Sequence, residues 1–470
     1  MQLIEWMNTY VLAAAVPAFL MGGGIYFMVR LRTLPLLFFR KRKRTPHRSD
    51  TKEGNSPWKA LAMALAGTLG VGNLVGVASA IAMGGAGAVF WMWVSATLAM
   101  PLKYGEIVLA IRHRRVDKSG VHGGAMYYMS DCCARKHPGI GRLCAMCFAF
   151  LCLIDALSMG CIVQVNAIAG AWQGIGGIRP WMIGGGMAIG VILCGMGGVR
   201  RISACTERLV PIMTGGFVLL SVVAISGHLR DVPEVFREIF TQAFQGSSVL
   251  GGVGGYLLTR AVRYGTMRGL LSNEAGCGTS PMAHATTSWN VSPVRQGCMG
   301  IIEVFVDTHV LCTMTALVIL LAWERVEDLG AEPMQMTLGA YEALLGPAAR
   351  IFMCVAVLCF GAATVFCWVH YACESCEYLV SGGRKESLTQ RQCEGVRRLC
   401  ILSCAGCCIR GAMMLPSQVW TVADFAIGSM TILNLVFLLS MQNEIVESSK
   451  ALSTTLTAKK ESTETGDTET

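Results

Sequence analysis

Two runs of glycine and polar residues interrupt apolar stretches of this sequence. The first is residues 67–73 (GTLGVGN) and the second is residues 268–278 (RGLLSNEAGCG). In a bilayer, an unwound backbone is tolerated where it lines a cavity or where a ligand completes its hydrogen bonds. The N-terminus of a half-helix suits an anionic group, and freed carbonyl groups suit a cation. The two runs therefore predict a binding site for a zwitterionic amino acid together with Na⁺ or H⁺.

Close packing between helices is an alternative reason for glycine in apolar stretches. It is sufficient for the glycines at 84, 85 and 87 and for those at 184–186. It does not explain why Asn273 and Glu274 stand side by side in the middle of such a stretch. We therefore interpret the second run as functional.

Ionisable side chains in the apolar stretches are a second group of candidates. A charged residue inside a span costs about 2.5–3.5 kcal/mol on insertion scales and is a functional candidate for that reason. Glu303 and Asp307 are four residues apart and share one helix face. A structural clamp with Arg260, Arg263 or Arg268 and a role in transport are equal alternatives for these carboxylates. The acids concerned are Glu106, Glu274, Glu303, Asp307 and Asp424.

The stretches that carry these residues are long enough to cross a membrane. The chain has 470 residues, of which 53% are hydrophobic and 15% are charged, whereas an ordinary soluble domain is about 25% charged. A helix of about 20 apolar residues spans the hydrocarbon core of a bilayer. The eleven predicted spans are 10–30, 60–83, 86–111, 143–170, 181–199, 209–227, 249–282, 299–322, 351–380, 399–415 and 419–442.

Basic residues lie in alternate loops between these spans. Clusters at 40–52, 112–142, 200–201 and 384–385 alternate with loops that are acidic or poor in cations. Because positive loops face the cytoplasm, eleven spans in an inner or plasma membrane place the N-terminus outside and the C-terminus in the cytoplasm. The net charge of +9 is thus assigned to topology, and no nucleic acid is expected as a partner.

The two interrupted spans hold corresponding positions in two sets of helices. If the first span is peripheral, spans two to six and seven to eleven form repeats of opposite orientation, because an odd number of helices reverses the chain. Paired broken helices in inverted halves mark the midplane site of a transporter. The predicted segments are an N-terminal peripheral helix (1–33), a basic cytoplasmic loop (34–57), a first five-helix repeat (58–230), a second five-helix repeat (249–442) and a disordered cytoplasmic tail (443–470).

Four segments resemble the alanine or glycine:cation symporter family, of the sodium:alanine symporter and D-alanine/glycine permease type. They are GTLGVGNLVG (67–76), AVFWMWVSATLAMPLKYGEIVLA (88–110), RGLLSNEAGCGTSPMAHA (268–285) and EVFVDTHVLCTMTAL (303–317). The resemblance covers nearly the whole chain, and RGxxSNEAG is its most specific element. It implies an all-α integral membrane protein with a LeuT-like 5+5 inverted repeat plus one N-terminal helix. It also implies import of alanine or glycine, in some members the D-forms, with Na⁺ by alternating access.

The resemblance further implies roles for individual residues. Residues of the two discontinuous helices hold the carboxylate and ammonium groups of the substrate, and these are Gly70, Gly72, Asn73, Ser272, Asn273 and Gly276. In the fourth span, Gln164 and Asn166 match a Q-x-N element whose amides hydrogen-bond the substrate, with a contact between helices as an equal alternative for Asn166. In the ninth span, Trp368 closes a small pocket, with an interfacial anchor as the alternative. Such a pocket favours alanine and glycine, because a methylene that does not fit costs about 1–3 kcal/mol.

The sequence departs from the family at positions that concern the coupling ion. That ion is expected near Val71, Asn73 and Thr364, but the family has threonine at position 71 and a pair of hydroxyls where this chain has Ala363 and Thr364. The loss of two oxygen atoms weakens the prediction that Na⁺ is the coupling ion and keeps H⁺ as the alternative. Asp155 has no acidic counterpart in the family and is the candidate for proton coupling. A position near the cytoplasmic end and a pairing with a hydrogen-bond donor are its alternatives.

Two other classes of function are alternatives to transport. An intramembrane enzyme is disfavoured, because no Gly-x-Ser-x-Gly elbow precedes a helix and no His-Glu-x-x-His motif is present. A non-transporting amino-acid sensor of the same fold stays as an alternative. The 21 cysteines have no metal-ligand spacing and are interpreted as apolar filler. The expected partners are a small neutral amino acid and the lipid bilayer, with no obligate protein partner.

Overall fold

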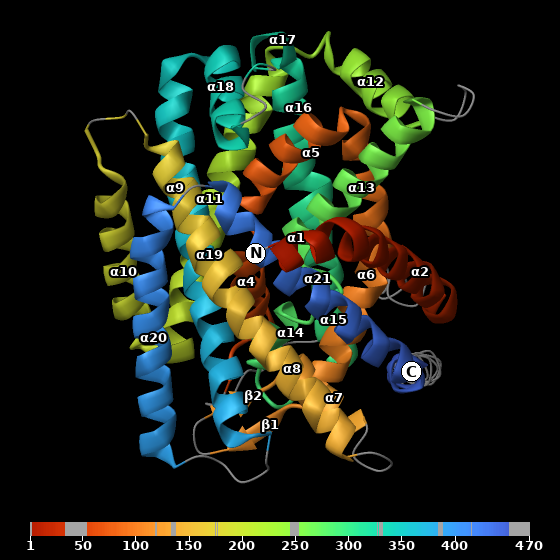
Figure 1. The fold of residues 1–470 in the computed structure, drawn as a ribbon, viewed down its shortest axis with the longest axis vertical. Coiled ribbons are helices and arrows are strands. Elements are labelled where there is room, and N and C mark those ends of the chain that lie inside the picture. The colour runs from red at the N-terminus through yellow and green to blue at the C-terminus, as the bar shows by residue number, and fades with distance from the viewer. Residues whose placement is uncertain are drawn as a thin grey trace, which may run out of the picture.

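The computed structural model describes residues 2–32, 54–117, 120–132, 138–173, 175, 177–244, 253–326, 328, 332–383, 389–414 and 416–450. These residues are almost entirely helical (Figure 1), and their strands form a two-stranded antiparallel hairpin. Most of the predicted basic loop 34–57, the cluster at 384–385 and residues 451–470 lie outside the described residues. The predicted tail begins as a helix, because residues 443–450 are helical.

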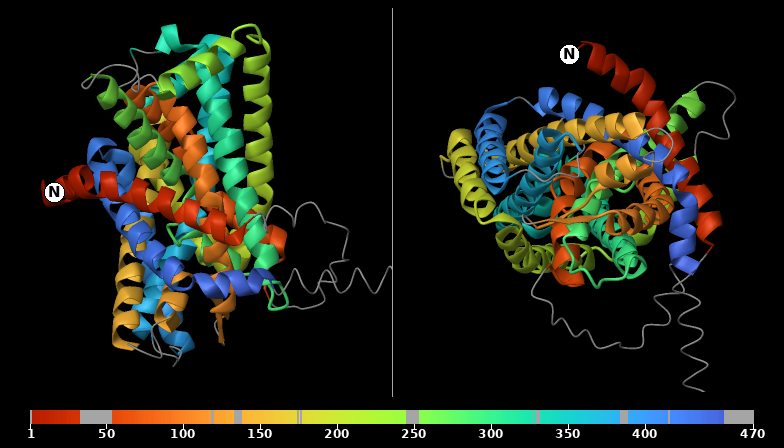
Figure 2. Two further views of the ribbon diagram at one scale, coloured as in Figure 1. Left: turned by 90° about the vertical axis from the view of Figure 1, so that its right-hand side faces the viewer. Right: turned by 90° about the horizontal axis from the view of Figure 1, so that it is seen from below.

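The N-terminal helix lies on the outside of the helical bundle. It comprises α1 (Gln2–Trp6), the π-helical turn η1 (Met7–Leu12) and α2 (Ala13–Leu31). It packs on α6 (Gly87–Arg112) and α21 (Pro416–Ser440) and crosses the edge of the bundle in Figure 2. Its buried face includes Leu20 and Phe27, while Tyr10 and Val29 are exposed.

The first interrupted span is a bent helix. α4 (Pro57–Thr68) begins with a proline, and the hydroxyl of Ser56 caps it by accepting the N–H of Lys59 at 3.2 Å. The chain leaves the helix at 69–71 and continues as the π-helical turn η2 (Gly72–Gly76) and α5 (Val77–Gly84), bent by 50° from α4. The break lies at the glycines where the sequence predicts it.

Helices of the first half continue around this break. After α6 come the hairpin and short α7, and then one long helix that contains a π-helical turn, η3. The elements are β1 (Arg115–Asp117), β2 (Gly120–His122), α7 (Ala125–Cys132), α8 (Pro138–Leu157), η3 (Ser158–Val163), α9 (Gln164–Ala171), α10 (Pro180–Gly195), α11 (Gly198–Ser226) and α12 (Val232–Phe244).

The second interrupted span is also a broken helix, formed by α13 (Val253–Asn273) and α14 (Ser280–Ala285). A following helix again contains a π-helical turn, η5. The remaining elements are α15 (Pro293–Val304), η5 (Phe305–Cys312), α16 (Thr313–Leu321), α17 (Trp323–Val326), α18 (Pro333–Leu345), α19 (Pro347–Ser381) and α20 (Gln390–Met413), followed by α21.

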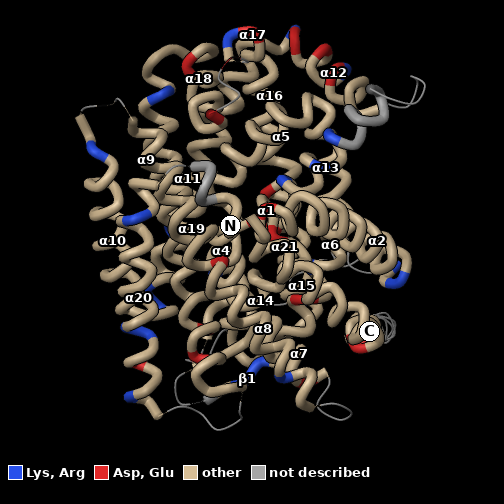
Figure 3. Tube along the Cα trace, viewed as in Figure 1, with Lys and Arg blue, Asp and Glu red and all other residues tan. Residues whose placement is uncertain are grey.

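Among the described residues, seven helices are long and apolar enough to cross a membrane, or eight if the bent pair of α4 with η2 and α5 counts as one span. The other three predicted spans fall on α10, which is shorter, on α13 with α14, and on α20. The count of eleven spans therefore stays a prediction. Figure 3 shows charged residues around α12 and α17 at the top of the molecule and near β1 and α7 at the bottom, with others at mid-height on α10 and α20 and beside α1.

Candidate functional site

The break between α13 and α14 is built on left-handed backbone conformations. Gly276 and Gly278 have φ angles of 87° and 82°, and Glu274 has a φ of 49°. Glycine adopts such angles at little cost, whereas other residues are strained by them. The sequence therefore ends α13 at Asn273 and frees the backbone that follows.

The carboxylate of Glu106 in α6 completes the hydrogen bonds of this break. It accepts the N–H of Gly276 at 3.1 Å and the N–H of Gly278 at 2.9 Å. Asn434 of α21 donates to Glu106 and to the carbonyl oxygen of Gly276, each at 2.8 Å, and the hydroxyl of Tyr128 donates to Asn434. At Gly276 the protein, and not a ligand, satisfies both backbone groups, so we do not carry this residue into the proposed substrate site.

A buried ion pair lies beside the same break. The ammonium group of Lys103 is 3.1 Å from Glu303 and 3.0 Å from the carbonyl oxygen of Asn273. Glu303 also lies 3.0 Å from the hydroxyl of Ser280 and from Nε2 of His284. Glu303 is thus a structural clamp, but its cationic partner is Lys103 and not one of the three arginines that we expected.

Arg268 makes a looser clamp nearby. Its guanidinium group lies 3.9 Å from the carboxylate of Asp424 and 5.1 Å from the ring centre of Trp420. These side chains line a cavity of about 240 Å³ that the N-terminal helix also borders. This clamp is partly exposed and contributes less than a buried pair.

The two broken helices meet at the carboxylate of Asp307 in η5. Asn73 of η2 donates to its Oδ1 at 2.7 Å, and Ser272 at the end of α13 donates to its Oδ2 at 2.6 Å. Thr308 donates to Oδ2 at 2.8 Å and accepts the amide of Asn273 at 3.1 Å. All five residues are buried. Three predicted site residues, Asn73, Ser272 and Asn273, are thereby brought together.

One oxygen of this cluster has no hydrogen-bond partner. Among the described residues, Oδ1 of Asn73 is buried and accepts no hydrogen bond. A buried acceptor without a donor is costly, and a bound cation or ammonium group would remove that cost. The donor set of amide oxygen, carboxylate and hydroxyl suits a hard cation such as Na⁺.

Gln164 closes the first break from the side of α9. Its Oε1 accepts the N–H of Val71 at 3.0 Å, and its Nε2 donates to the carbonyl oxygen of Met159 at 3.2 Å. A Cβ atom at Gly70 would lie 2.7 Å from Oε1 of Gln164 and 2.8 Å from Oγ1 of Thr364. Glycine at position 70 is thus required for this close approach. The other predicted glycine, Gly72, faces the backbone of residues 271–272 across the second break.

Thr364 and Val71, two predicted positions for the coupling ion, take part in hydrogen bonds within the protein. The hydroxyl of Thr364 lies 2.9 Å from the carbonyl oxygen of Ala66 and 3.0 Å from that of Phe360. The carbonyl oxygen of Val71 accepts the N–H groups of Leu74 and Val75. Both residues border the first break. The carbonyl oxygen of Val71 already accepts two N–H groups, whereas the hydroxyl of Thr364 only donates in these contacts, so its oxygen keeps the capacity to accept.

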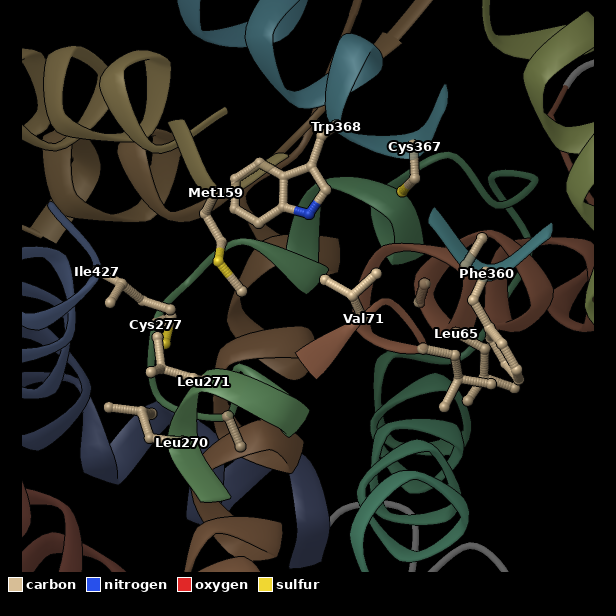
Figure 4. Packing of buried hydrophobic residues seen from close by; sticks show 14 of the residues in the cluster. Leu65, Val71, Met159, Leu270, Leu271, Cys277, Phe360, Cys367, Trp368 and Ile427 are labelled. Carbon is tan, nitrogen blue, oxygen red and sulfur yellow. The ribbon is translucent and has the colours of Figure 1, made fainter. Parts of the chain in front are cut away.

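The indole of Trp368 lies directly on the first break. It is fully buried, and its N–H donates to the carbonyl oxygen of Gly67 at 3.3 Å. Figure 4 shows the ring between Met159 and Val71. A fully buried ring in this place is not an interfacial anchor, and the closing of a small pocket by Trp368 stays a prediction.

Two predicted residues lie elsewhere. The amide of Asn166 donates to the carbonyl oxygens of Gly411 at 2.9 Å and Met414 at 2.7 Å, so it joins α9 to α20. Asp155 in α8 is completely buried, and neither carboxylate oxygen has a hydrogen-bond partner among the described residues. The expected pairing of Asp155 with a donor is therefore not present, and Asn166 makes the contact between helices that was its alternative.

Several residues that build this site were not assigned to it from the sequence. They are Lys103, Tyr128, Thr308 and Asn434, while Glu106 and Asp307 were noted only as acids within spans. A lysine inside an apolar stretch is a detectable signal, because such a charge needs a partner. Nothing in a single sequence shows which acid that partner is.

Comparisons with known proteins give the family of this chain. The sequence matches the profile of the sodium:alanine symporter family over residues 1–466. It is 34% identical over 463 residues to the sodium/alanine symporter AgcS of Methanococcus maripaludis, with 96% of each chain covered. It is 29% identical over 435 residues to a probable sodium/glutamine symporter, GlnT, of Bacillus subtilis, with 90% of this chain and 84% of the other covered.

A comparison with solved structures concerns the fold. The chain resembles a Na⁺-coupled sialic acid symporter in an outward-open state with a TM-score of 0.60 and 14% identity, covering 90% of this chain and 86% of the other. This likeness shows a shared fold and nothing about the substrate. From the match to the profile and the identity to AgcS, the chain belongs to the sodium:alanine symporter family.

Proposed function

We propose that this protein imports a small neutral amino acid, alanine or glycine, together with Na⁺ by alternating access across a bacterial inner membrane. Its family and its apolar helices make it a multi-pass membrane transporter. The observation that carries the finer proposal is the meeting of both broken helices at Asp307, to which Asn73 and Ser272 donate from opposite breaks.

We assign the coupling ion to the surroundings of Asn73 and Asp307. Oδ1 of Asn73 is buried without a partner among the described residues, and Asp307 supplies a negative charge close by. Na⁺ there would satisfy the amide oxygen and neutralise the carboxylate. In other transporters, too, the coupling ion is held at broken helices. Of the predicted positions for the coupling ion, Asn73 is the one that we retain in this assignment.

We assign the substrate to the first break, beside Trp368, Met159 and Val71. These apolar side chains (Figure 4) suit the hydrogen atom that is the side chain of glycine or the methyl group of alanine. A longer side chain would have to displace them, at about 1–3 kcal/mol for each methylene that does not fit. The backbone of residues 271–272 in the second break faces Gly72 of the first break, and we assign the polar groups of the amino acid to Ser272 and Asn273 there.

Uptake into proteoliposomes tests the proposal. Labelled alanine, glycine, D-alanine and glutamine are offered with imposed Na⁺ and H⁺ gradients applied separately. We expect Na⁺-driven accumulation of alanine or glycine and weak uptake of glutamine. Asn73→Ala should raise the Na⁺ concentration for half-maximal uptake about tenfold or more, which corresponds to about 1.4 kcal/mol or more.

The matched control for that variant is Asn443→Ala, which removes an exposed asparagine that accepts from Arg30. It should leave the Na⁺ dependence unchanged. Uptake that does not depend on the Na⁺ gradient would contradict the assignment of the ion to Asn73. Equal effects of Asn73→Ala and Asn443→Ala on the Na⁺ dependence would contradict it as well.

Proton coupling is the second candidate, and the buried carboxylate of Asp155 favours it. Neither of its oxygens has a partner among the described residues, so a proton is a chemically reasonable occupant. If protons drive transport, uptake follows the H⁺ gradient and Asp155→Asn abolishes that dependence. If Na⁺ drives transport, Asp155→Asn keeps the Na⁺ dependence. Binding of alanine without any accumulation would instead indicate a sensor.

A further inference from the structure

Three residues at one end of the molecule have the chemistry of a metal site that the transport site does not use. Nδ1 of His122, at the end of β2, lies 3.1 Å from Oε2 of Glu374 and 3.8 Å from Oε2 of Glu377. The glutamates stand three residues apart near the end of α19, at the lower end of the molecule in Figure 1. The three ligand atoms all lie within 4.8 Å of one another.

These spacings suit a single divalent ion. Metal–ligand bonds of about 2.0–2.2 Å place neighbouring ligand atoms about 3–4 Å apart, so an ion could contact all three atoms with little movement. One imidazole with two carboxylates is a ligand set for first-row transition metals. The side chains are largely withdrawn from solvent, with 11% of His122, 7% of Glu374 and 12% of Glu377 exposed.

The cluster lines a cavity that has space for further ligands. The cavity has a volume of about 580 Å³, so water molecules could complete the coordination. Its charged lining includes Arg200, Glu394 and Arg397 besides the cluster. Among the described lining residues, three carboxylates thus face two guanidinium groups, and this excess of negative charge favours a cation.

A second histidine precedes the cluster on the same helix. His370 lies one helical turn before Glu374, on the same face of α19. It is 2% exposed, and neither ring nitrogen has a hydrogen-bond partner among the described residues. A buried imidazole without partners is costly, and it provides another nitrogen donor within one turn of the cluster.

The cluster joins two separate groups of helices. The hairpin that carries His122 follows α6, which packs on α13 and α15, whereas α19 packs on α8, α11 and α20. The broken helix α13 thus belongs to the side of His122, and the two glutamates belong to the other side. An ion bound here would hold these groups together at one end of the molecule.

We propose that His122, Glu374 and Glu377 bind a divalent first-row transition-metal ion, and that the bound ion restrains this end of the transporter from opening. The restraint rests on the proposed function, because it matters only if the two groups of helices move during transport. The binding itself does not depend on transport.

Binding is tested with Mn²⁺ and the purified full chain. Mn²⁺ is the suitable probe because the chain has 21 cysteines and Mn²⁺ prefers oxygen and nitrogen to thiolate ligands. The magnetic resonance signal of free Mn²⁺ decreases as the ion binds, and we expect one site per chain. Glu377→Gln and His122→Gln should each weaken binding at least about tenfold.

The control is Glu394→Gln, which removes a carboxylate from the same cavity but not from the cluster. It should change binding much less than Glu377→Gln does. Absence of stoichiometric binding, or equal losses in the cluster variants and the control, would overturn the metal site. Elution of each variant as a monodisperse peak, like the parent, shows that lost binding is not lost folding.

Transport gives a separate readout. With Mn²⁺ on both faces of proteoliposomes, we expect slower uptake by the parent and little change in Glu377→Gln. Binding without any effect on measurable uptake would overturn the restraint. Binding by a chain that transports no amino acid would uphold the metal site and contradict the proposed function, so the two failures are distinguishable.

Discussion

At the scale of single residues, the buried Lys103 connects a charge network to the backbone of the second break. Its ammonium group contacts both Glu303 and the carbonyl oxygen of Asn273, and the side chains of the ion pair are fully buried. Replacing a whole buried ion pair by apolar groups often costs little, whereas removing one partner leaves an uncompensated charge. The pair can therefore be tested by comparing single and double substitutions.

Lys103→Met should lower the free energy of unfolding by about 3–5 kcal/mol, because it leaves the carboxylate of Glu303 without its cation. The double variant Lys103→Met with Glu303→Gln should recover a large part of that loss. Thermal unfolding of the detergent-purified proteins measures both effects. A double variant as unstable as the single one would show that the unpaired charge is not the cause.

His113 forms a second charged cluster just beyond α6, outside the predicted spans. Its Nδ1 lies 3.0 Å from Asp131, and its Nε2 lies 3.1 Å from Glu444. Burial lowers the pKa of His113, but the hydrogen bonds and charges of Asp131 and Glu444 outweigh burial and raise the pKa to about 9. Burial raises the pKa of Asp131, but the hydrogen bond from His113 and the charge of Arg115 lower it overall.

This raised pKa predicts a pH dependence of stability. The contribution of His113 is complete below its unfolded pKa of about 6.5 and disappears as pH rises through about 9. The free energy of unfolding should therefore fall by about 1–3 kcal/mol between these values, since a tenfold change in a protonation equilibrium is about 1.4 kcal/mol. His113→Gln should remove this slope, whereas His228→Gln should keep it. Measuring the free energy of unfolding at a series of pH values tests this prediction. An unchanged slope against pH in His113→Gln would contradict the assignment of the slope to His113.

At the scale of elements, the second break depends on two glycines that differ in their surroundings. A Cβ atom at Gly276 would meet Leu435 at an ordinary 3.6 Å, but one at Gly278 would lie 2.9 Å from the Cβ of Ala125 and from the ring of Phe148. Both positions have positive φ angles. Backbone strain thus acts at both positions, and steric overlap acts at one.

Gly276→Ala should cost about 1–2 kcal/mol from backbone strain alone. Gly278→Ala should cost about 1–3 kcal/mol more, because the added methyl group overpacks the contact with α7 and α8. Chemical or thermal unfolding of the two variants gives the difference. Equal losses would mean that the neighbours move aside and that strain is the whole effect.

The breaks themselves could be predicted from the sequence, because glycine with polar residues inside an apolar stretch is a local pattern. The convergence of Asn73, Ser272 and Asn273 also followed, since both breaks were assigned to one site. Pairings between distant elements could not be derived. Glu106 satisfies backbone groups 170 and 172 residues away. For Asn166 the sequence left a substrate contact and a contact between helices as equal alternatives, because no local pattern encodes which helix lies opposite a polar side chain; the structure shows the contact with α20.

At the scale of the whole molecule, the candidate site lies between two groups of helices. α6, α13 and α15 pack together, while α19 packs on α8, α11 and α20, and α4 contacts both α14 and α19. Asn73, Ser272, Asp307 and Trp368 are all buried between them. An amino acid can reach these residues only if the groups move relative to each other. Na⁺ would drive such movement if it binds the two conformations with different affinity.

The helices also define two opposite ends of the molecule. The orientation in the membrane decides which of these ends faces the cytoplasm. α12, α17 and α18 lie at one end, and the hairpin β1–β2 lies at the other (Figure 1). The basic residues Arg112 and Arg114 precede the hairpin and Arg115 begins it, whereas the segment around α17 carries Glu324 and Glu332. Because positive loops stay in the cytoplasm, we expect the hairpin inside and α17 outside.

Reporter insertions test this orientation. A fluorescent protein after residue 470 should fluoresce, because the C-terminus is predicted to be cytoplasmic, and alkaline phosphatase there should be inactive. Alkaline phosphatase inserted between α17 and α18 should be active, because that connection is predicted to be outside. Opposite results at both positions would invert the orientation. Matching results at the two positions would require an even number of crossings between α17 and the C-terminus, whereas the prediction has three, formed by α19, α20 and α21. That outcome would remove α20, with its five charged residues, from the set of spans.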